Sequence, residues 1–184
     1  MTDAFDAAAG ELRAAAAGIA PVEIDTACAI IAAANRIVLY GCGREGLQLR
    51  GFAMRLHHLG RDVAMQGDMA APPVGPGDLF VASAGPGELA TVTALMKVAR
   101  AAGADILFLT AEPDAPTTAL ATHRLVIPAQ TMARDLGPDS SAVLPMGSVY
   151  EGALFLLFEI MVLRLRADLG ITPERMRANH TNLE

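Results

Sequence analysis

Short runs of apolar residues recur through the middle of the chain, and a glycine or proline follows each run within three residues. These runs lie at 36–40, 62–65, 78–83, 105–110 and 124–127. Apolar runs of this length are typical of parallel strands that are buried on both faces. Stretches with apolar residues at helical spacing lie between them, at 47–59, 88–102 and, more briefly, 116–121. Strands that alternate with helices predict an open, parallel α/β sheet.

Both ends of the chain are predicted to be helical. The alanine-rich first 35 residues predict two helices divided near Gly18–Pro21, because proline favours the first turn of a helix. A long apolar helix is predicted from about Gly147 to Leu169, and Thr172 begins a capping pattern in the tail. The stretch 128–145 carries little periodicity, and we expect it to be a functional loop.

The length and composition fit one domain that associates with copies of itself. A chain of 184 residues is within the usual range of a single domain. Its residues are 53% hydrophobic and 18% charged, which is apolar for a monomer and indicates a hidden interface. We expect a homo-oligomer, a tetramer or dimer, formed through the long helix and the N-terminal helices. The expected parts of domain 1–184 are N-terminal helices (1–35), an α/β core (36–146) and a long helix with a tail (147–184).

Charge and residue usage argue against several kinds of partner. The net charge of −6, the 4% of aromatic residues and the absence of tryptophan do not fit a nucleic-acid binder. The most apolar run, 153–163, is too short to cross a bilayer, and no secretory signal opens the chain. Cys28 and Cys42 lack metal-ligand spacing. We therefore expect a cytoplasmic protein that contacts neither nucleic acid nor membrane.

Two glycine-rich loops are the candidate ligand-binding segments. One is Gly41–Gly46 after the first strand, and the other is Ser83–Glu88 after the third. Ligands of open α/β sheets bind outside the carboxyl ends of the strands, where the strand order reverses. Glycines let backbone N–H groups approach an anion, and the helix that follows adds its positive end. Two such loops favour a ligand over a bare strand-to-helix turn.

The first loop also matches the dinucleotide pattern GxGxxG, and Asp68 follows about twenty residues later, where that fingerprint has its acidic residue. A dinucleotide-binding oxidoreductase is therefore one hypothesis. The pattern alone is weak, because a tight turn needs the same glycines.

Four segments stand out in order along the chain: GCGREGLQLRGFAMRLHHLG at 41–60, DLFVASAGPGE at 78–88, PMGSVYE at 145–151 and NHTNLE at 179–184. They resemble segments of the 6-phospho-3-hexuloisomerases of the sugar isomerase (SIS) domain superfamily. The resemblance covers about residues 10–184. It implies the SIS fold, a flavodoxin-like three-layer sandwich with a five-stranded parallel sheet between helices. It also implies isomerisation of 3-hexulose 6-phosphate and fructose 6-phosphate, a tetramer, and neither a metal nor a redox cofactor.

The resemblance assigns roles to individual residues. Glu151 matches the catalytic glutamate that moves a proton beside the carbonyl, although a carboxylate at a helix start can simply complement the dipole. His180 matches the tail histidine, a candidate acid or ring-opening group that we expect to complete a neighbouring subunit's site. The expected substrate-binding residues are Gly41, Gly43, Arg44, Glu45, Ser83, Ala84, Gly85, Gly87 and Glu88.

The segment DLFVASAGPGE occupies the place of the family's phosphate loop, but it departs from the usual sequence of that loop, SGSGET. Pro86 stands at its second serine and Leu89 at its threonine, so these two positions lose their hydroxyls, and Pro86 also lacks an amide donor. Glu45 stands where the family has a serine, and its charge opposes a nearby phosphate. Arg44 can offset that charge, and Ser140 or Ser141 are candidates to supply hydroxyls.

These observations support two main hypotheses, which belong to different classes. The leading one is a sugar-phosphate isomerase that works through an enediol and is most like the 6-phospho-3-hexuloisomerases, with the altered loop leaving open a shift of substrate. The other is a catalytically silent SIS domain that binds a sugar phosphate as a sensor or partner module.

Overall fold

Five parallel strands form the centre of the molecule, in the order β2-β1-β3-β4-β5. A computed structural model describes residues 2–137 and 140–183 of the chain. The strands are β1 (Ile37–Gly41), β2 (Val63–Met65), β3 (Leu79–Ser83), β4 (Asp105–Thr110) and β5 (His123–Val126). The α-helices are α1 (Thr2–Ala17), α2 (Pro21–Ala33), α3 (Gly43–His58), α4 (Ala90–Ala101), α5 (Ser148–Asp168) and α6 (Pro173–Ala178). Two 3₁₀ turns, η1 (Pro116–Leu120) and η2 (Met132–Arg134), complete the elements.

The strand order reverses between β1 and β3. The chain moves from β1 outward to β2 and then returns to the other side of β1, where β3 pairs in parallel. In this pairing Gly41 lies opposite Ser83, the last residues of the two strands. Both glycine loops therefore leave the sheet side by side at the point where open α/β sheets bind ligands.

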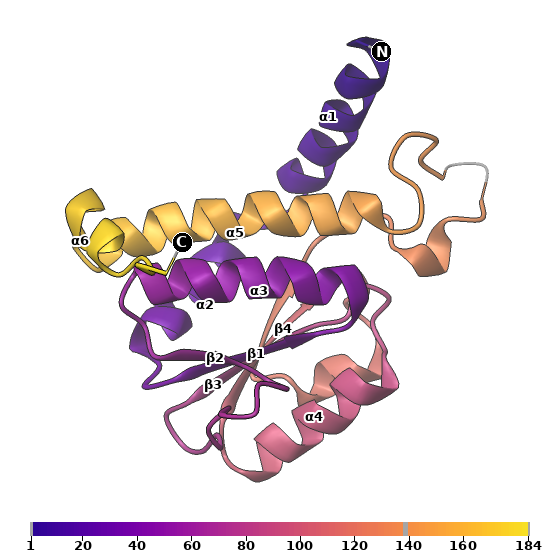
Figure 1. The fold of residues 1–184 in the computed structure, drawn as a ribbon. Coiled ribbons are helices and arrows are strands. Elements are labelled where there is room, and N and C mark those ends of the chain that lie inside the picture. The colour runs from indigo at the N-terminus through magenta and orange to yellow at the C-terminus, as the bar shows by residue number, and fades with distance from the viewer. Residues whose placement is uncertain (1, 138–139, 184) are drawn as a thin grey trace.

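Helices cover both faces of the sheet and make a three-layer sandwich (Figure 1). Alternate strand residues point to opposite faces. Leu39, Val81 and Leu107 pack into a core with α2, α3 and α5, whereas Val38 and Phe80 pack on the other face with α4. The predicted doubly covered parallel sheet is confirmed.

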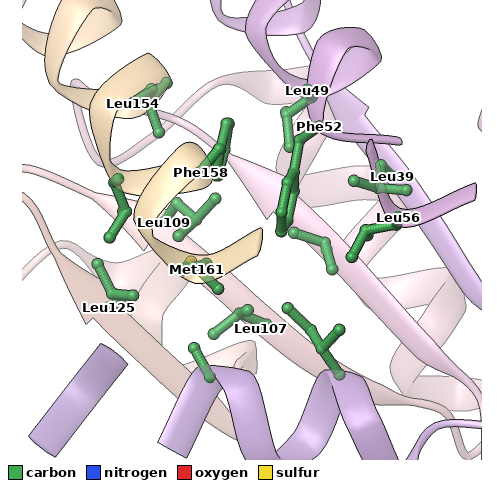
Figure 2. Close-up of a cluster of buried hydrophobic side chains, with 14 of the residues drawn as sticks. Leu39, Leu49, Phe52, Leu56, Leu107, Leu109, Leu125, Leu154, Phe158 and Met161 are labelled. Atoms are coloured by element: carbon green, nitrogen blue, oxygen red, sulfur yellow. The ribbon is translucent and has the colours of Figure 1, made fainter. Parts of the chain in front are cut away.

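The larger core joins α3 to α5. Phe52 of α3 and Phe158 of α5 stack face to face, with ring centroids 4.3 Å apart and an angle of 4° between the planes. Leucines from both helices and from the sheet surround this pair (Figure 2). Both rings are almost completely buried. Because these aromatic rings lock the two helices together, the first turns of α3 and α5 keep a fixed relation to each other.

The N-terminal helix α1 crosses α5 and projects beyond the rest of the molecule (Figure 1). The crossing is close at Gly152, where an added Cβ would lie 2.6 Å from Leu12. Of the residues in α1, only Ala15 is buried, and Phe5 is 75% exposed. Most of this helix therefore presents its surface to solvent or to another molecule.

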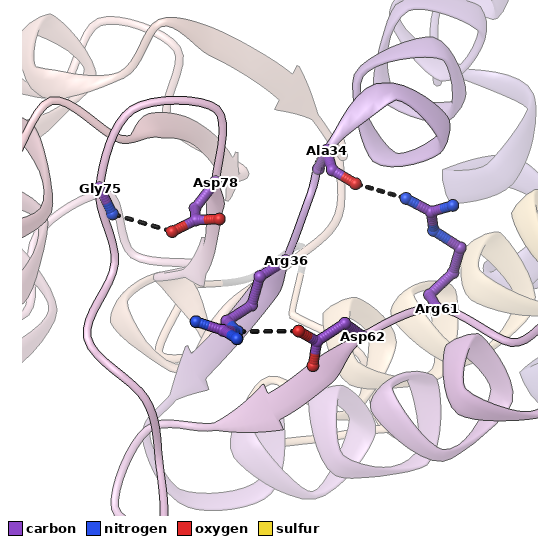
Figure 3. Close-up of polar contacts among 6 residues, drawn as sticks. All are labelled: Ala34, Arg36, Arg61, Asp62, Gly75 and Asp78. Carbon is purple, nitrogen blue, oxygen red and sulfur yellow. Dashed lines mark hydrogen bonds and ion pairs between the residues drawn. The ribbon is translucent and has the colours of Figure 1, made fainter.

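Polar contacts hold the opposite edge of the sheet, where the strands begin (Figure 3). The Arg36 guanidinium pairs with Asp62 at 2.9 Å, which joins the segments entering β1 and β2. Arg61 donates to the carbonyl of Ala34, and the Asp78 carboxylate accepts from the backbone N–H of Gly75 at 2.9 Å. These contacts therefore stabilise the segments that lead into β1, β2 and β3.

Element boundaries differ from the sequence prediction in two places. α3 begins at Gly43, four residues earlier than predicted, so that Arg44 and Glu45 lie in its first turn instead of in a loop. α4 begins at Ala90, which leaves Glu88 in the preceding turn.

Glu184, the last residue of the tail motif, lies outside the described residues, as do residues 138–139 of the predicted functional loop. Among residues 2–137 and 140–183, no single helix is both long enough and apolar enough to cross a membrane. α1 and α2 taken together have that length and apolarity, but the chain bends by 76° between them.

Candidate active site

A cleft of about 510 Å³ lies at the carboxyl ends of β1 and β3, between the first turns of α3 and α5. Its walls come from four segments: the start of α3, the turn after β3, the loop around η2, and the residues leading into α5. The lining residues are Cys42, Gly43, Arg44, Glu45, Pro86, Leu89, Thr131, Met132, Pro145, Met146, Gly147, Ser148, Tyr150 and Glu151. A cavity of this size accommodates a small organic molecule.

Glu151 lies in the first turn of α5 and faces this cleft. Its side chain is only 15% exposed, and its Oε2 pairs with the Nε of Arg44 at 3.0 Å. Burial raises the pKa of Glu151; the Arg44 charge lowers that pKa, and the nearby Glu45 charge raises it. A carboxylate held in this way can accept a proton at a pH closer to neutral than an exposed one can.

Arg44 connects the two helix starts. Besides its pair with Glu151, it donates through Nη1 to the Ser148 hydroxyl at 2.9 Å and through Nη2 to the carbonyl of Met146. Met146 has a φ of 57° and Gly147 a φ of 83°, both in the left-handed region, which is uncommon for methionine. Arg44 therefore fixes the strained turn that aims Glu151 into the cleft.

Glu45 extends from the first turn of α3 to the end of β3. The Ser83 hydroxyl donates to its Oε2 at 2.5 Å, and the Gly85 backbone N–H lies 3.1 Å from both of its carboxylate oxygens. The Tyr150 hydroxyl lies 3.3 Å from the Ser83 oxygen. Burial raises the pKa of Glu45, while the hydrogen bonds from the Ser83 hydroxyl and the Gly85 backbone N–H act to lower it. Burial also raises the pKa of Tyr150 well above its usual value.

Sequence reasoning missed Thr131, which lines the same cleft. The side chain is 3% exposed, and its hydroxyl has no hydrogen-bond partner among the residues that the structure describes. An unpaired buried hydroxyl is costly, and a ligand oxygen in the cleft would satisfy it. No motif marks this threonine; its position in the weakly periodic stretch 128–145 was the one available signal.

Several predicted binding residues support the cleft from behind instead of lining it. Ser83, Ala84 and Gly85 are buried beneath it, and Gly41 lies so close to Gly46 that a side chain at Gly46 would strike the Gly41 carbonyl oxygen. Gly87, with a φ of 86°, forms the turn before α4, and Glu88 is exposed outside the lining.

The candidate substitute hydroxyls lie elsewhere. Ser140 donates to the Gly137 carbonyl, and Ser141 accepts from the backbone N–H groups of Val143 and Leu144, so that both stabilise their own loop. The described part of the chain contains no group of three or more His, Cys, Asp or Glu residues that could hold a metal ion.

Comparison with known families decides the membership of the chain. A family model described as SIS domain matches residues 30–155. The chain belongs to the SIS domain family. The resemblance that the glycine loops and the tail indicated is thus confirmed, and the match spans the sheet, both glycine loops and the start of α5.

Several relatives of this SIS chain are named 3-hexulose-6-phosphate isomerase. A 3-hexulose-6-phosphate isomerase from Methylomonas aminofaciens is 35% identical over 165 residues, which cover 87% of each protein. The 3-hexulose-6-phosphate isomerase of Mycobacterium gastri is 32% identical over 174 residues, 95% of this chain and 86% of that protein. A hypothetical protein from Methanococcus jannaschii, whose crystal structure was said to infer the same molecular function, superposes with a TM-score of 0.78. Its identity is 24%, over 88% of this chain and 86% of that one, and it shows the shared fold.

The two predicted catalytic residues of the SIS chain are not brought together within one molecule. His180 follows α6, and its ring stacks on His58 with centroids 5.0 Å apart. His58 ends α3, so it is about 20 Å along the helix from Glu45. Figure 1 likewise places the C-terminus at the end of α5 away from its first turn.

Asp68, on which the dinucleotide hypothesis rests, also lies away from the cleft. Its carboxylate is 3.8 Å from the Arg50 guanidinium, and it does not belong to the lining. The geometry therefore gives this residue no contact with a ligand bound at the glycine loops.

Proposed function

We propose that this SIS domain is a sugar-phosphate isomerase that interconverts 3-hexulose 6-phosphate and fructose 6-phosphate, an intramolecular oxidoreductase acting on ketose phosphates. The observation that carries the proposal is the partly buried carboxylate of Glu151, with a raised pKa, aimed into the cleft at the switch point of the sheet. The names of the relatives at 35% and 32% identity support the same substrate class.

The reaction moves a carbonyl by one carbon, and Glu151 supplies the necessary base. Its carboxylate removes the proton from the carbon beside the carbonyl, which gives an enediol, and returns that proton to the neighbouring carbon. Arg44 stabilises the ionised form of Glu151 and orients it through their ion pair. The enediol oxygens exchange their own protons, so the atoms balance without any oxidant or reductant.

A neighbouring subunit completes the site in this proposal. Within one chain His180 stacks on His58 at the end of α3, whereas Glu151 pairs with Arg44 at the start of α3, so the two cannot act on the same substrate. We therefore place the acid or ring-opening role of His180 in the cleft of another copy. A row of exposed apolar residues on α5, Leu156, Ile160 and Leu163, recurs at helical spacing and fits an interface.

The homo-oligomer can be tested through this apolar row. Light scattering of the wild-type protein is expected to give the mass of a dimer or tetramer. Ile160→Glu places a charge in the middle of the interface and is expected to shift the mass towards that of one chain. A wild-type protein that is a monodisperse monomer at micromolar concentration would refute both the oligomer and the shared site.

Arg44 should set the pH dependence of the reaction. Its charge lowers the pKa of Glu151, and a base must be ionised, so activity falls as the pH drops through that pKa. Arg44→Met removes the charge and is expected to move the acidic limb of the kcat profile to higher pH. Arg50→Met, which removes the same charge outside the cleft, should leave this limb in place. An unmoved limb in Arg44→Met, or an equal shift in both variants, speaks against the ion pair's role.

Turnover itself is the test of the proposed function. The protein is incubated with 3-hexulose 6-phosphate, and the appearance of fructose 6-phosphate is followed by carbon NMR. Steady conversion, dependent on enzyme concentration, is the expected result. No conversion at any substrate concentration would exclude the isomerase.

The position of Glu45 favours a second candidate function. Its carboxylate already occupies the donors at the end of β3. A silent SIS domain that binds a sugar phosphate as a sensor or partner module is consistent with such an altered loop. Tight binding of fructose 6-phosphate without conversion or proton exchange would support this alternative, and conversion would exclude it.

A further inference from the structure

The turn after β3 forms a small cradle of hydrogen-bond donors. The Ser83 hydroxyl and the Gly85 backbone N–H point at one spot, and both residues are buried. Convergent donors of this kind, at a glycine-rich turn, are a general means of binding an anion. The carboxylate of Glu45 occupies this spot, and both of its oxygens accept hydrogen bonds from these donors.

Binding of a second anion beside the Glu45 carboxylate in this cradle is energetically unfavourable. The lining of the cleft holds two carboxylates, Glu45 and Glu151, and one guanidinium, Arg44. Arg44 is already engaged with Glu151 and with the turn before α5. A phosphate entering the cradle would therefore have to displace a partly buried carboxylate and remain beside its charge, with no free cation among the described lining residues to offset it.

The remaining polar groups near the cradle suit neutral oxygens. Carboxylate oxygens accept hydrogen bonds from sugar hydroxyls, and Glu45 retains lone pairs for this purpose. The buried hydroxyl of Thr131, which lines the same cleft and has no partner in the described residues, can pair with an oxygen of a ligand. Pro86, Leu89 and Met132 form an apolar wall beside them.

We propose that Glu45 is a specificity-determining residue: it excludes phosphate from the Ser83–Gly85 cradle, and the cleft takes hydroxyl groups of its substrate there. The sugar enters with its hydroxyl-bearing carbons towards Glu45 and Thr131, and its phosphate lies outside the cradle. This orientation rests on the proposed function for the identity of the substrate. The exclusion of phosphate rests on the cradle alone.

Binding of inorganic phosphate, measured by calorimetry at pH 8 on the full chain, tests the proposal. The wild-type protein should bind phosphate more weakly than about 1 mM. Glu45→Ser opens the cradle, and Glu45→Gln keeps the shape of the side chain without its charge. Each is expected to bind phosphate about tenfold more tightly than the wild type, or more.

The control is Asp114→Asn, which removes one negative charge from an exposed turn outside the cleft. It should bind phosphate as the wild type does. The proposal is overturned if both Glu45 variants bind phosphate no better than the wild type, or if Asp114→Asn gains as much as they do. A wild-type dissociation constant well below about 1 mM overturns it even where the variants do not fold.

The outcome is independent of turnover. If the Glu45 variants gain phosphate binding but the wild type never converts 3-hexulose 6-phosphate, the proposed function fails and the role of Glu45 stands. If the wild type is an active isomerase whose cradle binds phosphate tightly, the role of Glu45 fails and the proposed function stands.

Discussion

Glu151→Gln is expected to lower kcat for 3-hexulose 6-phosphate by about 10²–10⁴-fold, the usual contribution of a positioned general base. The amide keeps the size of the side chain and its place in the first turn of α5, but it cannot accept a proton from carbon. Because the ground-state contacts of the substrate are largely retained, KM should change little. Steady-state kinetics of the purified variant, with thermal unfolding to verify the fold, gives the measurement.

The matched control for this loss lies on the same helix. Glu159 pairs with Arg55, its nitrogen–oxygen distance being 3.0 Å, and lies two turns from Glu151 outside the cleft. Glu159→Gln should leave kcat within about twofold of the wild type, since this ion pair is partly exposed and lies outside the cleft. A Glu151→Gln variant that keeps full turnover would show that another group is the base.

Phe158→Ala is expected to lower the free energy of unfolding by about 3–5 kcal/mol, as large deletions in a buried core do. Its ring is 3% exposed and stacks on Phe52, and it holds α5 against α3 (Figure 2). The loss combines the missing apolar contacts with the cavity that the surrounding leucines cannot fill. Urea unfolding followed by circular dichroism gives the value.

An exposed apolar residue provides the comparison. Met69, in the turn after β2, is fully exposed, and Met69→Ala should change the free energy of unfolding by no more than about 0.5 kcal/mol. A Phe158→Ala variant as stable as Met69→Ala would mean that the α3–α5 contact does not hold the fold. In that case the packing of Phe158 on Phe52 would not explain the fixed geometry between the first turns of α3 and α5.

The sequence predicts the sheet well because strands that are buried on both faces require consecutive apolar residues. Each of the five strands is a run of apolar residues with a turn after it, and all five were placed within one or two residues of their observed bounds. The start of α3 was missed by four residues. Its first residues include Gly43 and Gly46, which are poor helix formers, and the close approach to Gly41 requires the glycine at 46.

The site was only partly predictable. The sequence resemblance singled out Glu151, Arg44 and Ser83, and the structure places the first two in contact across 107 residues of chain. No local pattern encodes such a contact, because it depends on how α3 packs on α5. The charge of Glu45 was expected to oppose a phosphate. That its carboxylate binds to the donors of the Ser83–Gly85 cradle could not be predicted, because this contact depends on the pairing of β1 with β3. No motif marks Thr131, and its position in the weakly periodic stretch 128–145 was the one available signal.

Proton NMR of fructose 6-phosphate, incubated with the protein in heavy water, tests the central claim most directly. An enediol between carbons 2 and 3 leaves the carbon 3 proton open to exchange, so our account predicts deuterium at carbon 3 or the appearance of the 3-hexulose. Glu151→Gln should slow the appearance of both signals by the same factor as kcat, about 10²–10⁴. Deuterium at carbon 1 would indicate an aldose–ketose isomerase instead. Neither exchange nor product, at a substrate concentration high enough to fill the cleft, would contradict the isomerase and leave a silent binding domain.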